Sequence, residues 1–236
     1  MRLNAVEAIS LDLDDTLWSF AQAVAGAEDA LRSWLIEHAP GTAGVLATRE
    51  ALGRLRVQFE TVRPDLAGDY RRLRLGSIQM ALEQAGEDVS LVETAYGIFF
   101  SARQKVEFFE DVLPSLEWLS TRFPLVAVTN GNADLQQTGG AHFFKGTLHA
   151  ATVGVAKPDA AIFHAAAQMV DVVPRSMLHV GDDYAADVLG AIGAGMQAAW
   201  LVRDPSTTQA VTPRIQREPH LVIPTLTRLC EMLGRN

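Results

Sequence analysis

A change from apolar to acidic residues within residues 9–17 is the sharpest feature of the hydrophobic pattern. The apolar run there ends in three carboxylates, Asp12, Asp14 and Asp15. Because burying unpaired charge is costly, the run is predicted to be a strand whose last residues leave the core and face solvent or a cation. Alternate side chains of an extended chain share a face, so Asp12 and Asp14 are expected together, with Asp15 on the other side. Asp12 and Asp14 are therefore the candidate working pair.

Residues 19–105 have apolar positions three or four apart, which is the spacing of amphipathic helices. Helices are predicted at residues 20–35, 49–59, 66–86 and 91–100. Pro40, Gly41 and Gly44 break the first stretch of this pattern, and Pro64 interrupts the second. The block is therefore predicted to be an all-helical insertion.

From residue 106 onward, short apolar runs alternate with stretches of helical spacing. Strands are predicted at residues 125–129, 147–153, 177–181, 198–202 and 221–223. Helices are predicted at 113–119, 160–170 and 184–193, and at the end around Cys230. Strands that are apolar throughout belong to a sheet covered on both faces, and strand–helix alternation indicates right-handed crossovers. The predicted fold class is α/β, a doubly wound parallel sheet formed by residues 1–18 and 106–236, with the helical block 19–105 inserted.

Composition and charge are those of an ordinary globular chain and argue against some functions. The 236 residues are 48% hydrophobic and 20% charged, which lies in the globular range. The net charge of −8 argues against a general nucleic-acid or anionic-membrane binder, since both need a basic surface. The single Cys230 cannot form an intrachain disulfide, no apolar run reaches membrane-spanning length, and no secretory signal is visible. A cytoplasmic monomer or weak homodimer is expected.

The unusual polar residues of the chain follow the predicted strands. Ligands of doubly wound sheets bind outside the carboxyl ends of the strands. The residues at or after these ends are Asp12, Asp14, Thr129, Asn130, Lys157, Asp182, Asp183 and Asp187. Several carboxylates with one lysine and one hydroxyl suit a hard divalent cation beside a phosphate group, and Mg²⁺ needs only a few protein oxygens. Asp12, Asp182 and one backbone carbonyl are enough for such a site.

The same residue types support phosphoryl transfer. A carboxylate can attack phosphorus and form an aspartyl phosphate that water later cleaves. Asp14 is suited to protonate the leaving oxygen and afterwards to activate water. Lys157 would offset charge on the phosphate oxygens, and Thr129 and the Asn130 amide would donate hydrogen bonds to them. The sequence therefore predicts a phosphate site next to the metal site.

Four motifs, in this order and spacing, resemble those of the haloacid dehalogenase superfamily of phosphohydrolases. They are Asp12-Leu13-Asp14-Asp15-Thr16-Leu17, Thr129-Asn130, Lys157-Pro158 and Gly181-Asp182-Asp183-Tyr184-Ala185-Ala186-Asp187. The resemblance implies that Asp12 is the nucleophile and Asp14 the general acid and base. It also implies Mg²⁺ held by Asp12, the Asp14 carbonyl and Asp182.

The resemblance has further implications outside these catalytic groups. Asp187 would orient the site or Lys157, and Asp183 would be an outer-shell partner. Residues 19–105 are similar to the helical C1-type cap of this superfamily, which closes over the substrate.

Within the superfamily, residues 128–133 and 179–183 are most similar to bacterial phosphatases of riboflavin synthesis. The resemblance implies 5-amino-6-(5-phospho-D-ribitylamino)uracil as a candidate substrate. In the insertion the similarity is restricted to residues 72–78. Because caps choose substrates, the core motifs imply the reaction class and not the particular substrate, and a small phosphorylated metabolite is the expected partner.

Other functions share part of this pattern. A phosphomutase would have every core residue and return the phosphate to its substrate, and a regulatory or binding protein could keep the site without turnover. A dehalogenase needs an electropositive halide pocket, against which the Asp14 and Asp182 carboxylates argue. Trp18 either lines the site entrance or packs the hinge of the insertion, whereas His179, inside an apolar strand, is expected to be a satisfied core histidine rather than a ligand.

Overall fold

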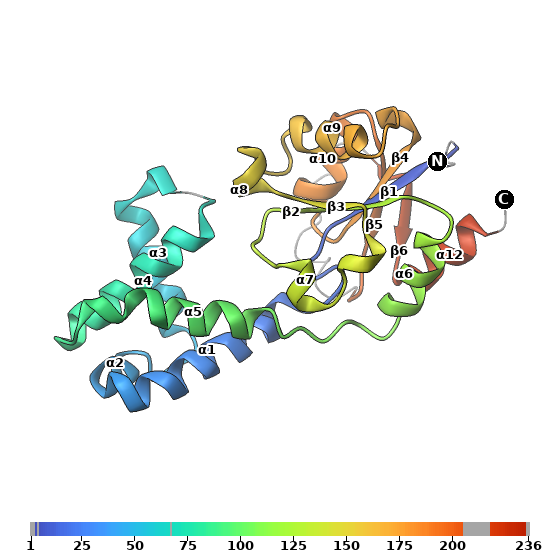
Figure 1. The fold of residues 1–236 in the computed structure, drawn as a ribbon. Helices are drawn as coiled ribbons and strands as arrows, with labels where there is room; N and C mark the ends of the chain where they lie inside the picture. Colours follow the sequence, from blue (N-terminus) through green and yellow to red (C-terminus); the bar gives the residue numbers. More distant parts are fainter. Residues whose placement is uncertain (1–2, 4, 67, 205–217, 235–236) are drawn as a thin grey trace. The chain divides into compact units, whose positions relative to one another are not determined.

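The computed structural model describes residues 3, 5–66, 68–204 and 218–234. The chain forms two compact units (Figure 1). The sheet unit comprises Met1–Ser19, Phe108–Gly131 and Gly139–Asn236, and the helical unit comprises Phe20–Glu107 and Asn132–Thr138. The division into a catalytic core, residues 1–18 and 106–236, and a cap, residues 19–105, stays a prediction about function. The segment Asn132–Thr138, which lies outside the predicted cap range, belongs to the helical unit by its contacts.

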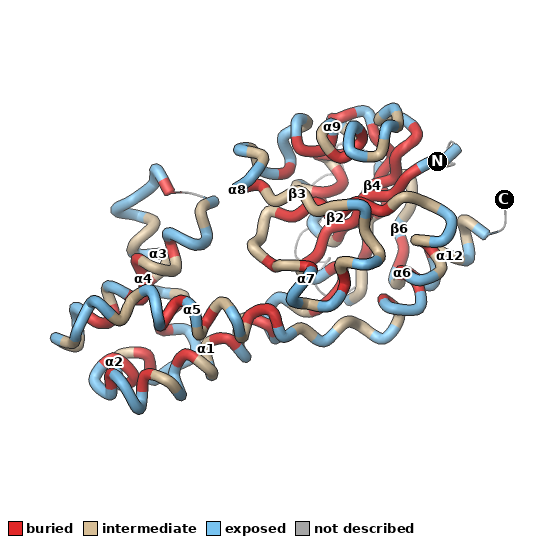
Figure 2. The backbone as a smooth tube through the Cα atoms, viewed as in Figure 1, coloured by how far each residue is buried: buried red, intermediate tan, exposed pale blue. Residues whose placement is uncertain are grey.

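The sheet has six parallel strands in the order β3-β2-β1-β4-β5-β6. The strands are β1 (Ala8–Leu11), β2 (Leu125–Thr129), β3 (Gly146–His149), β4 (Met177–Gly181), β5 (Gln197–Leu201) and β6 (Leu221–Ile223). Every residue of β1, β2 and β4 is buried (Figure 2), as expected for central strands covered on both faces. The predicted α/β fold with a parallel sheet is confirmed.

The first strand lies at the point where the strand order reverses. β1 pairs with β2 on one side and with β4 on the other, so that Leu11 faces both Ala127 and Val180. The next backbone N–H, that of Asp12, donates to the Val180 carbonyl at 2.9 Å. Open parallel sheets bind ligands at such a switch point, outside the carboxyl ends of the strands. The first acidic motif therefore lies at this switch point.

Helices cover both sides of the sheet (Figure 1). The helices of this unit are α6 (Val112–Ser120), α8 (Ala150–Val153), α9 (Ala160–Met169), α10 (Gly190–Gly193) and α12 (Leu226–Leu233). Figure 1 shows α9 and α10 on one side and α6 beside α12 on the other. The first side is a continuous apolar core in which Phe163 of α9 packs with Val126 and Met177 of the strands. This packing fixes the strand ends from which the polar residues project.

The helical unit has a hydrophobic core of its own. Its helices are α1 (Phe20–His38), α2 (Pro40–Val45), α3 (Ala51–Val62), α4 (Tyr70–Ala85), α5 (Val92–Arg103) and the short α7 (Leu135–Thr138). Leu31, Leu35, Ile78 and Leu82 are almost completely buried in this core. Each recurs at helical spacing on the inward face of its helix, as the pattern predicts. Among the described residues, no helix is both long and apolar enough to cross a membrane.

One short helix, which the sequence did not predict, follows the predicted break after the first helix. α2 starts at Pro40, a position where proline is favoured because the first helical N–H needs no partner. The Glu87 carboxylate accepts hydrogen bonds from the backbone N–H groups of Gly41 and Thr42, at 2.9 and 2.7 Å. The first helix does end before Pro40, as predicted, but the short helix that follows was missed because the group that satisfies its start lies far along the chain.

Two predicted elements change character part of the way along. The strand predicted at 147–153 ends at His149, and Ala150–Val153 forms a helical turn closed by Gly154 with φ of 87°. The helix predicted at 184–193 starts as a π-helix over Tyr184–Leu189 before α10. Both deviations lie at the carboxyl ends of strands, where the chain must turn polar residues toward the site.

Candidate active site

The first acidic motif lies in a loop after β1. The predicted extended chain stops at Leu11, and Asp15 adopts the left-handed conformation with φ of 58°, which Asp tolerates better than most residues. Its N–H donates to the Trp18 carbonyl at 2.8 Å and closes the loop. Asp12 is 9% exposed, Asp14 is partly buried and Asp15 is exposed. Asp12 and Asp14 are thus less exposed than Asp15, as predicted, although a turn and not a strand separates them from it.

Asp14 is held by the side chain of Trp18. The buried Trp18 indole donates to Asp14 Oδ1 at 2.8 Å and stands edge-on to Phe108, with ring centroids 5.3 Å apart. Beside it, a Cβ added to Gly131 would lie only 2.7 Å from Asp14 Oδ2, so a larger residue there would displace the Asp14 carboxylate. Trp18 therefore positions the second carboxylate, which neither of its two proposed roles anticipated.

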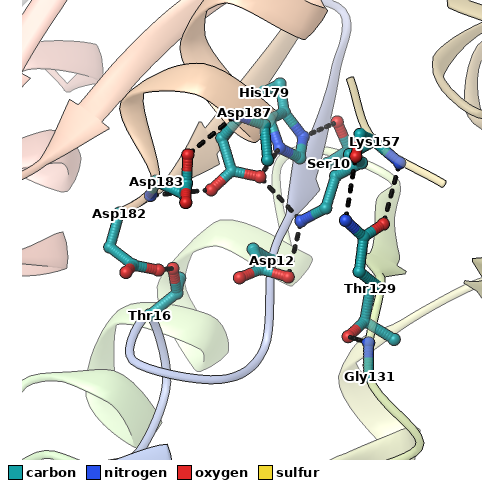
Figure 3. A network of polar contacts seen from close by, with 12 residues as sticks. Ser10, Asp12, Thr16, Thr129, Gly131, Lys157, His179, Asp182, Asp183 and Asp187 are labelled. Carbon is teal, nitrogen blue, oxygen red and sulfur yellow. Dashed lines mark hydrogen bonds and ion pairs between the residues drawn. The ribbon is translucent and has the colours of Figure 1, made fainter. Parts of the chain in front are cut away.

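Lys157 joins two carboxylates in the interior (Figure 3). Its Nζ lies 2.6 Å from Asp12 Oδ1 and 2.6 Å from Asp187 Oδ1, and all three side chains are buried. Burial opposes the charge of Lys157, but the two carboxylates outweigh this and raise its pKa above the ordinary value. Burial likewise opposes the charge of Asp187, but Lys157 and His179 outweigh this and lower its pKa. The pKa of Asp12 is raised by burial, which Lys157 only partly offsets, and by the charge of Asp187.

Asp182 follows β4 and has two supporting partners. Thr16 Oγ1 donates to Asp182 Oδ1 at 3.0 Å, and the Trp200 indole donates to the Asp182 carbonyl at 2.8 Å. Burial, reinforced by the charge of Asp187, raises the pKa of Asp182 to about 7. The first and fourth motifs are thereby joined, and a second carboxylate of high proton affinity lies near Asp12.

A tight turn directs Asp187 inward. The turn is the π-helix of Tyr184–Leu189, a form that recurs at functional sites. Asp187 Oδ2 accepts from the Asp183 N–H at 3.0 Å, and a Cβ on Gly181 would lie 2.2 Å from Asp187 Cγ, so only glycine fits there. The Asp183 side chain caps this turn by accepting from two backbone N–H groups at 2.8 Å. Asp183 thus supports the site from outside, at a helix start.

Thr129 and Asn130 end β2 and differ in what they hold. Thr129 is buried, and its Oγ1 accepts from the Gly131 N–H at 2.9 Å, which leaves its O–H available as a donor. The Asn130 side chain pairs with the Lys157 backbone, donating to the carbonyl at 2.9 Å and accepting from the N–H at 2.8 Å. The Asn130 side-chain amide is thereby committed to positioning Lys157, so a phosphate contact would fall to its backbone N–H.

His179 and Ser10 complete the network at its inner end. His179 is buried, its Nδ1 lies 2.8 Å from Ser10 Oγ, and its Nε2 lies 3.1 Å from Asp187 Oδ1. Burial lowers the pKa of His179 despite the Asp187 carboxylate, so the ring is neutral. The prediction of a satisfied core histidine agrees with these contacts. Ser10, a polar residue in an otherwise apolar strand, was the overlooked signal.

The oxygen groups present fit a divalent cation. Carboxylate oxygens of Asp12, Asp182 and Asp187 lie within 4.8 Å of one another. Both oxygens of Asp187 already accept hydrogen bonds, which leaves Asp12 and Asp182 as the carboxylates best placed to bind a metal. Burial and neighbouring carboxylates raise the pKa of both groups, and a hard cation would stabilise their charged forms. The contribution of the Asp14 carbonyl stays a prediction.

The parallel sheet thus carries a buried aspartate, a lysine and an acidic cluster at its switch point, where open α/β sheets bind their ligands. Residues 6–195 match the haloacid dehalogenase-like hydrolase family. The chain belongs to this family and is a hydrolase.

Relatives with assigned activities fall into two groups. The chain is 32% identical over 235 residues to the 5-amino-6-(5-phospho-D-ribitylamino)uracil phosphatase YigB of Escherichia coli K12, with 98% of each chain covered. It is 33% identical over 129 residues, 52% of each chain, to a phosphoserine phosphatase of Thermus thermophilus. Among solved structures, a 2-haloacid dehalogenase from Pseudomonas syringae pv. tomato DC3000 has a TM-score of 0.84 at 36% identity, covering 98% of this chain and 99% of that one.

Proposed function

We propose that this hydrolase is a Mg²⁺-dependent phosphatase that cleaves the phosphomonoester of a small metabolite through an aspartyl phosphate on Asp12. The supporting observation is the charge of the site. The Lys157 ammonium group pairs with Asp12 and Asp187, and a carboxylate oxygen of Asp182 lies within 4.8 Å of oxygens of both. Such an excess of carboxylate suits a divalent cation with a phosphate beside it and disfavours an anionic haloacid without a metal.

Asp12 is the nucleophile in this proposal. Lys157 holds Asp12 Oδ1 at 2.6 Å and so fixes the direction of the carboxylate, whose other oxygen attacks phosphorus. A bond forms between this oxygen and phosphorus while the bond from phosphorus to the ester oxygen breaks. Asp14, oriented by Trp18, gives its proton to the leaving oxygen.

The second half of the reaction regenerates Asp12. Asp14, now a carboxylate, takes a proton from a water molecule that attacks phosphorus and breaks the bond to Asp12. Lys157, the Thr129 hydroxyl and the Asn130 backbone N–H would stabilise the phosphate oxygens. Asp12, Asp182 and the Asp14 carbonyl would hold Mg²⁺, which when bound neutralises phosphate charge.

For the substrate, we propose 5-amino-6-(5-phospho-D-ribitylamino)uracil, an intermediate of riboflavin synthesis. This rests on the Escherichia coli relative, which is similar along 98% of both chains. The helical unit would act as the cap that selects the substrate and excludes water. A cytoplasmic monomer or weak homodimer remains our expectation.

Hydrolysis of p-nitrophenyl phosphate tests the reaction class. Phosphate release is expected with Mg²⁺ and is expected to disappear with EDTA and in Asp12→Asn. A panel of sugar, nucleotide and ribitylaminouracil phosphates then tests the substrate, with the last expected to give the highest kcat/KM. Product analysis showing phosphate retained on the substrate would identify a phosphomutase instead.

A 2-haloacid dehalogenase is the second candidate, because a solved structure with that name is 36% identical to this chain. In that reaction, a carboxylate would attack carbon and displace halide. Halide release from 2-chloropropionate, with no activity on any phosphate ester, would favour it. If a well-folded protein turned over neither class of compound, the binding-protein alternative would take precedence.

A further inference from the structure

We propose that Ser10 and His179 are positioning residues that hold Lys157 against Asp12 through Asp187. The inference deepens the proposed function and rests on it for its kinetic part. Neither residue belongs to the four motifs, and neither contacts the Asp12 oxygens directly in the network of Figure 3. Their effect on the reaction would be indirect, through the direction and rigidity of the lysine.

Five side chains form a series of polar contacts that the backbone between Ser10 and Asp12 closes into a loop, called the ring below. Ser10 Oγ lies 2.8 Å from His179 Nδ1, and His179 Nε2 lies 3.1 Å from Asp187 Oδ1. Asp187 Oδ1 lies 2.6 Å from Lys157 Nζ, which lies 2.6 Å from Asp12 Oδ1. Because Ser10 and Asp12 are two residues apart, the ring starts and ends on the same segment of chain. Movement of Lys157 away from Asp12 would therefore break contacts on both sides.

Backbone register sets the first link of this ring. Ser10 on β1 and His179 on β4 are direct partners in the parallel pairing. The ring of Phe163 stands edge-on to the His179 imidazole, with centroids 5.0 Å apart and planes at 85°. The imidazole is thus fixed by a strand partner on one side and by the α9 side chain on the other. A side chain locked in this way can orient the carboxylate that pairs with Lys157.

The donor inventory fixes the direction of every hydrogen bond in the ring. The ionised Asp187 can only accept, so His179 Nε2 must carry the proton that it donates. In the neutral ring Nδ1 is then an acceptor, and the Ser10 hydroxyl must donate to it. The opposite tautomer would set the Nε2 lone pair against the carboxylate. Ser10 therefore selects the tautomer that stabilises the charge of Asp187, and this charge holds Lys157.

The burial of these groups explains why a purely structural role is insufficient. Ser10, His179 and Asp187 are each at most 1% exposed. A buried polar network is at best weakly stabilising compared with well-packed apolar side chains. Orientation of Lys157 is a benefit that apolar side chains at these positions could not supply.

Kinetics of matched variants test the proposal. Ser10→Ala and His179→Leu are expected to lower kcat by about 10-fold or more, the usual effect of removing such supporting partners. Ser10→Thr, which keeps the hydroxyl, and His179→Gln, which keeps a donor toward Asp187, are expected to restore most of kcat. The control is Ser176→Ala, which removes a buried hydroxyl bonded to Glu7 at 3.2 Å in the same unit. It is expected to leave kcat unchanged.

Stability is measured alongside, so that unfolding is not mistaken for lost positioning. If folded Ser10→Ala and His179→Leu kept the wild-type kcat and KM, the proposal would be overturned. The same holds if activity followed melting temperature equally in these variants and in Ser176→Ala.

A spectroscopic readout separates this inference from the proposed function. The ¹⁵N NMR spectrum of the imidazole is expected to show His179 as the Nε2–H tautomer in the wild type, and Ser10→Ala is expected to perturb the Nδ1 signal and broaden the Lys157 ammonium signal. An Nδ1–H tautomer would overturn the inference whatever the protein hydrolyses. Absence of phosphatase activity with the expected spectrum would reject the proposed function alone.

Discussion

Buried charged groups dominate the site at the scale of single residues. Lys157 is shared by two carboxylates, of which Asp187 is held ionised while Asp12 has a raised pKa. Asp182 has a pKa of about 7 because of burial and the nearby Asp187 charge. Each raised carboxyl pKa represents free energy that a bound cation would recover, since one pKa unit corresponds to about 1.4 kcal/mol.

The pKa of Asp182 predicts how Mg²⁺ binding depends on pH. Below about pH 7 the metal must displace a proton from Asp182, so the apparent affinity is expected to fall by up to about tenfold per pH unit and to level off above pH 7. Titration calorimetry in buffers of different ionisation enthalpy measures both the affinity and the released proton. Asp182→Asn should abolish the dependence together with tight binding. An affinity that is constant between about pH 6 and pH 8 would contradict the assignment.

The raised pKa of Asp182 also determines how the free energy of unfolding changes with pH when no metal is bound. The folded carboxyl keeps its proton up to about pH 7, whereas the unfolded chain releases it near the ordinary value of 3.8. Between these values the folded state binds more protons, so Asp182 makes the free energy of unfolding decrease as pH rises. Mg²⁺ is expected to remove this loss.

Removal of Lys157 should lower the stability of the protein, because two buried carboxylates depend on its charge. Lys157→Met leaves the buried Asp12 and Asp187 carboxylates without their cation, so the free energy of unfolding at pH 7 is expected to fall by about 3 kcal/mol in urea titrations without metal. A loss below about 0.5 kcal/mol, as for an ordinary surface substitution, would show that the ion pairs are not buried as described.

At the scale of elements, strand β4 and the π-helix after it place the fourth motif. A Cβ added at Gly181 would clash with Asp187, whereas one added at Gly193, in α10, would meet nothing within 4 Å. Gly181→Ala is expected to displace Asp187 and to lower kcat by at least about 10-fold. Gly193→Ala is expected to preserve kcat and to raise stability by about 0.5–1 kcal/mol through helix propensity. Equal kinetics for the two variants would contradict this account.

Hydrophobic periodicity was sufficient to predict the central elements. β2 and β4 are continuous apolar runs, and α1 and α9 have clear helical spacing, so local sequence determines them. α2 was missed because its N–H groups are satisfied by Glu87, 46 positions beyond Gly41. The local sequence pattern gives no information about such a distant partner.

In the site too, the features set by local sequence could be predicted, whereas those set by contacts between distant residues could not. Asp12, Thr129, Lys157 and Asp182 could be placed together because parallel strand ends meet at one edge of the sheet. The Ser10–His179 contact, which joins residues 169 positions apart, depends on strand register and could not be predicted. Trp18 was ambiguous because its hydrogen bond to Asp14 depends on a loop closed by the left-handed Asp15.

At the scale of the whole molecule, each of the two compact units has its own apolar core. Leu82→Ala in the helical unit is expected to cost about 2–5 kcal/mol of stability, the usual effect of a large cavity. Proteolysis under native conditions should then increase within Phe20–Glu107, while Mg²⁺ affinity stays unchanged. Leu116→Ala, equally buried in the sheet unit, is the matched control. Equal cleavage patterns for the two variants would show that the units do not open independently.

The most direct test of the central claim is mass spectrometry of the protein after rapid acid quenching during turnover of a phosphate ester. The account predicts a phosphoryl group on the peptide that contains Asp12 in the wild type, and none in Asp12→Asn. Full turnover without any covalent intermediate, or a phosphoryl group on another residue, would contradict the assignment of Asp12 as the nucleophile.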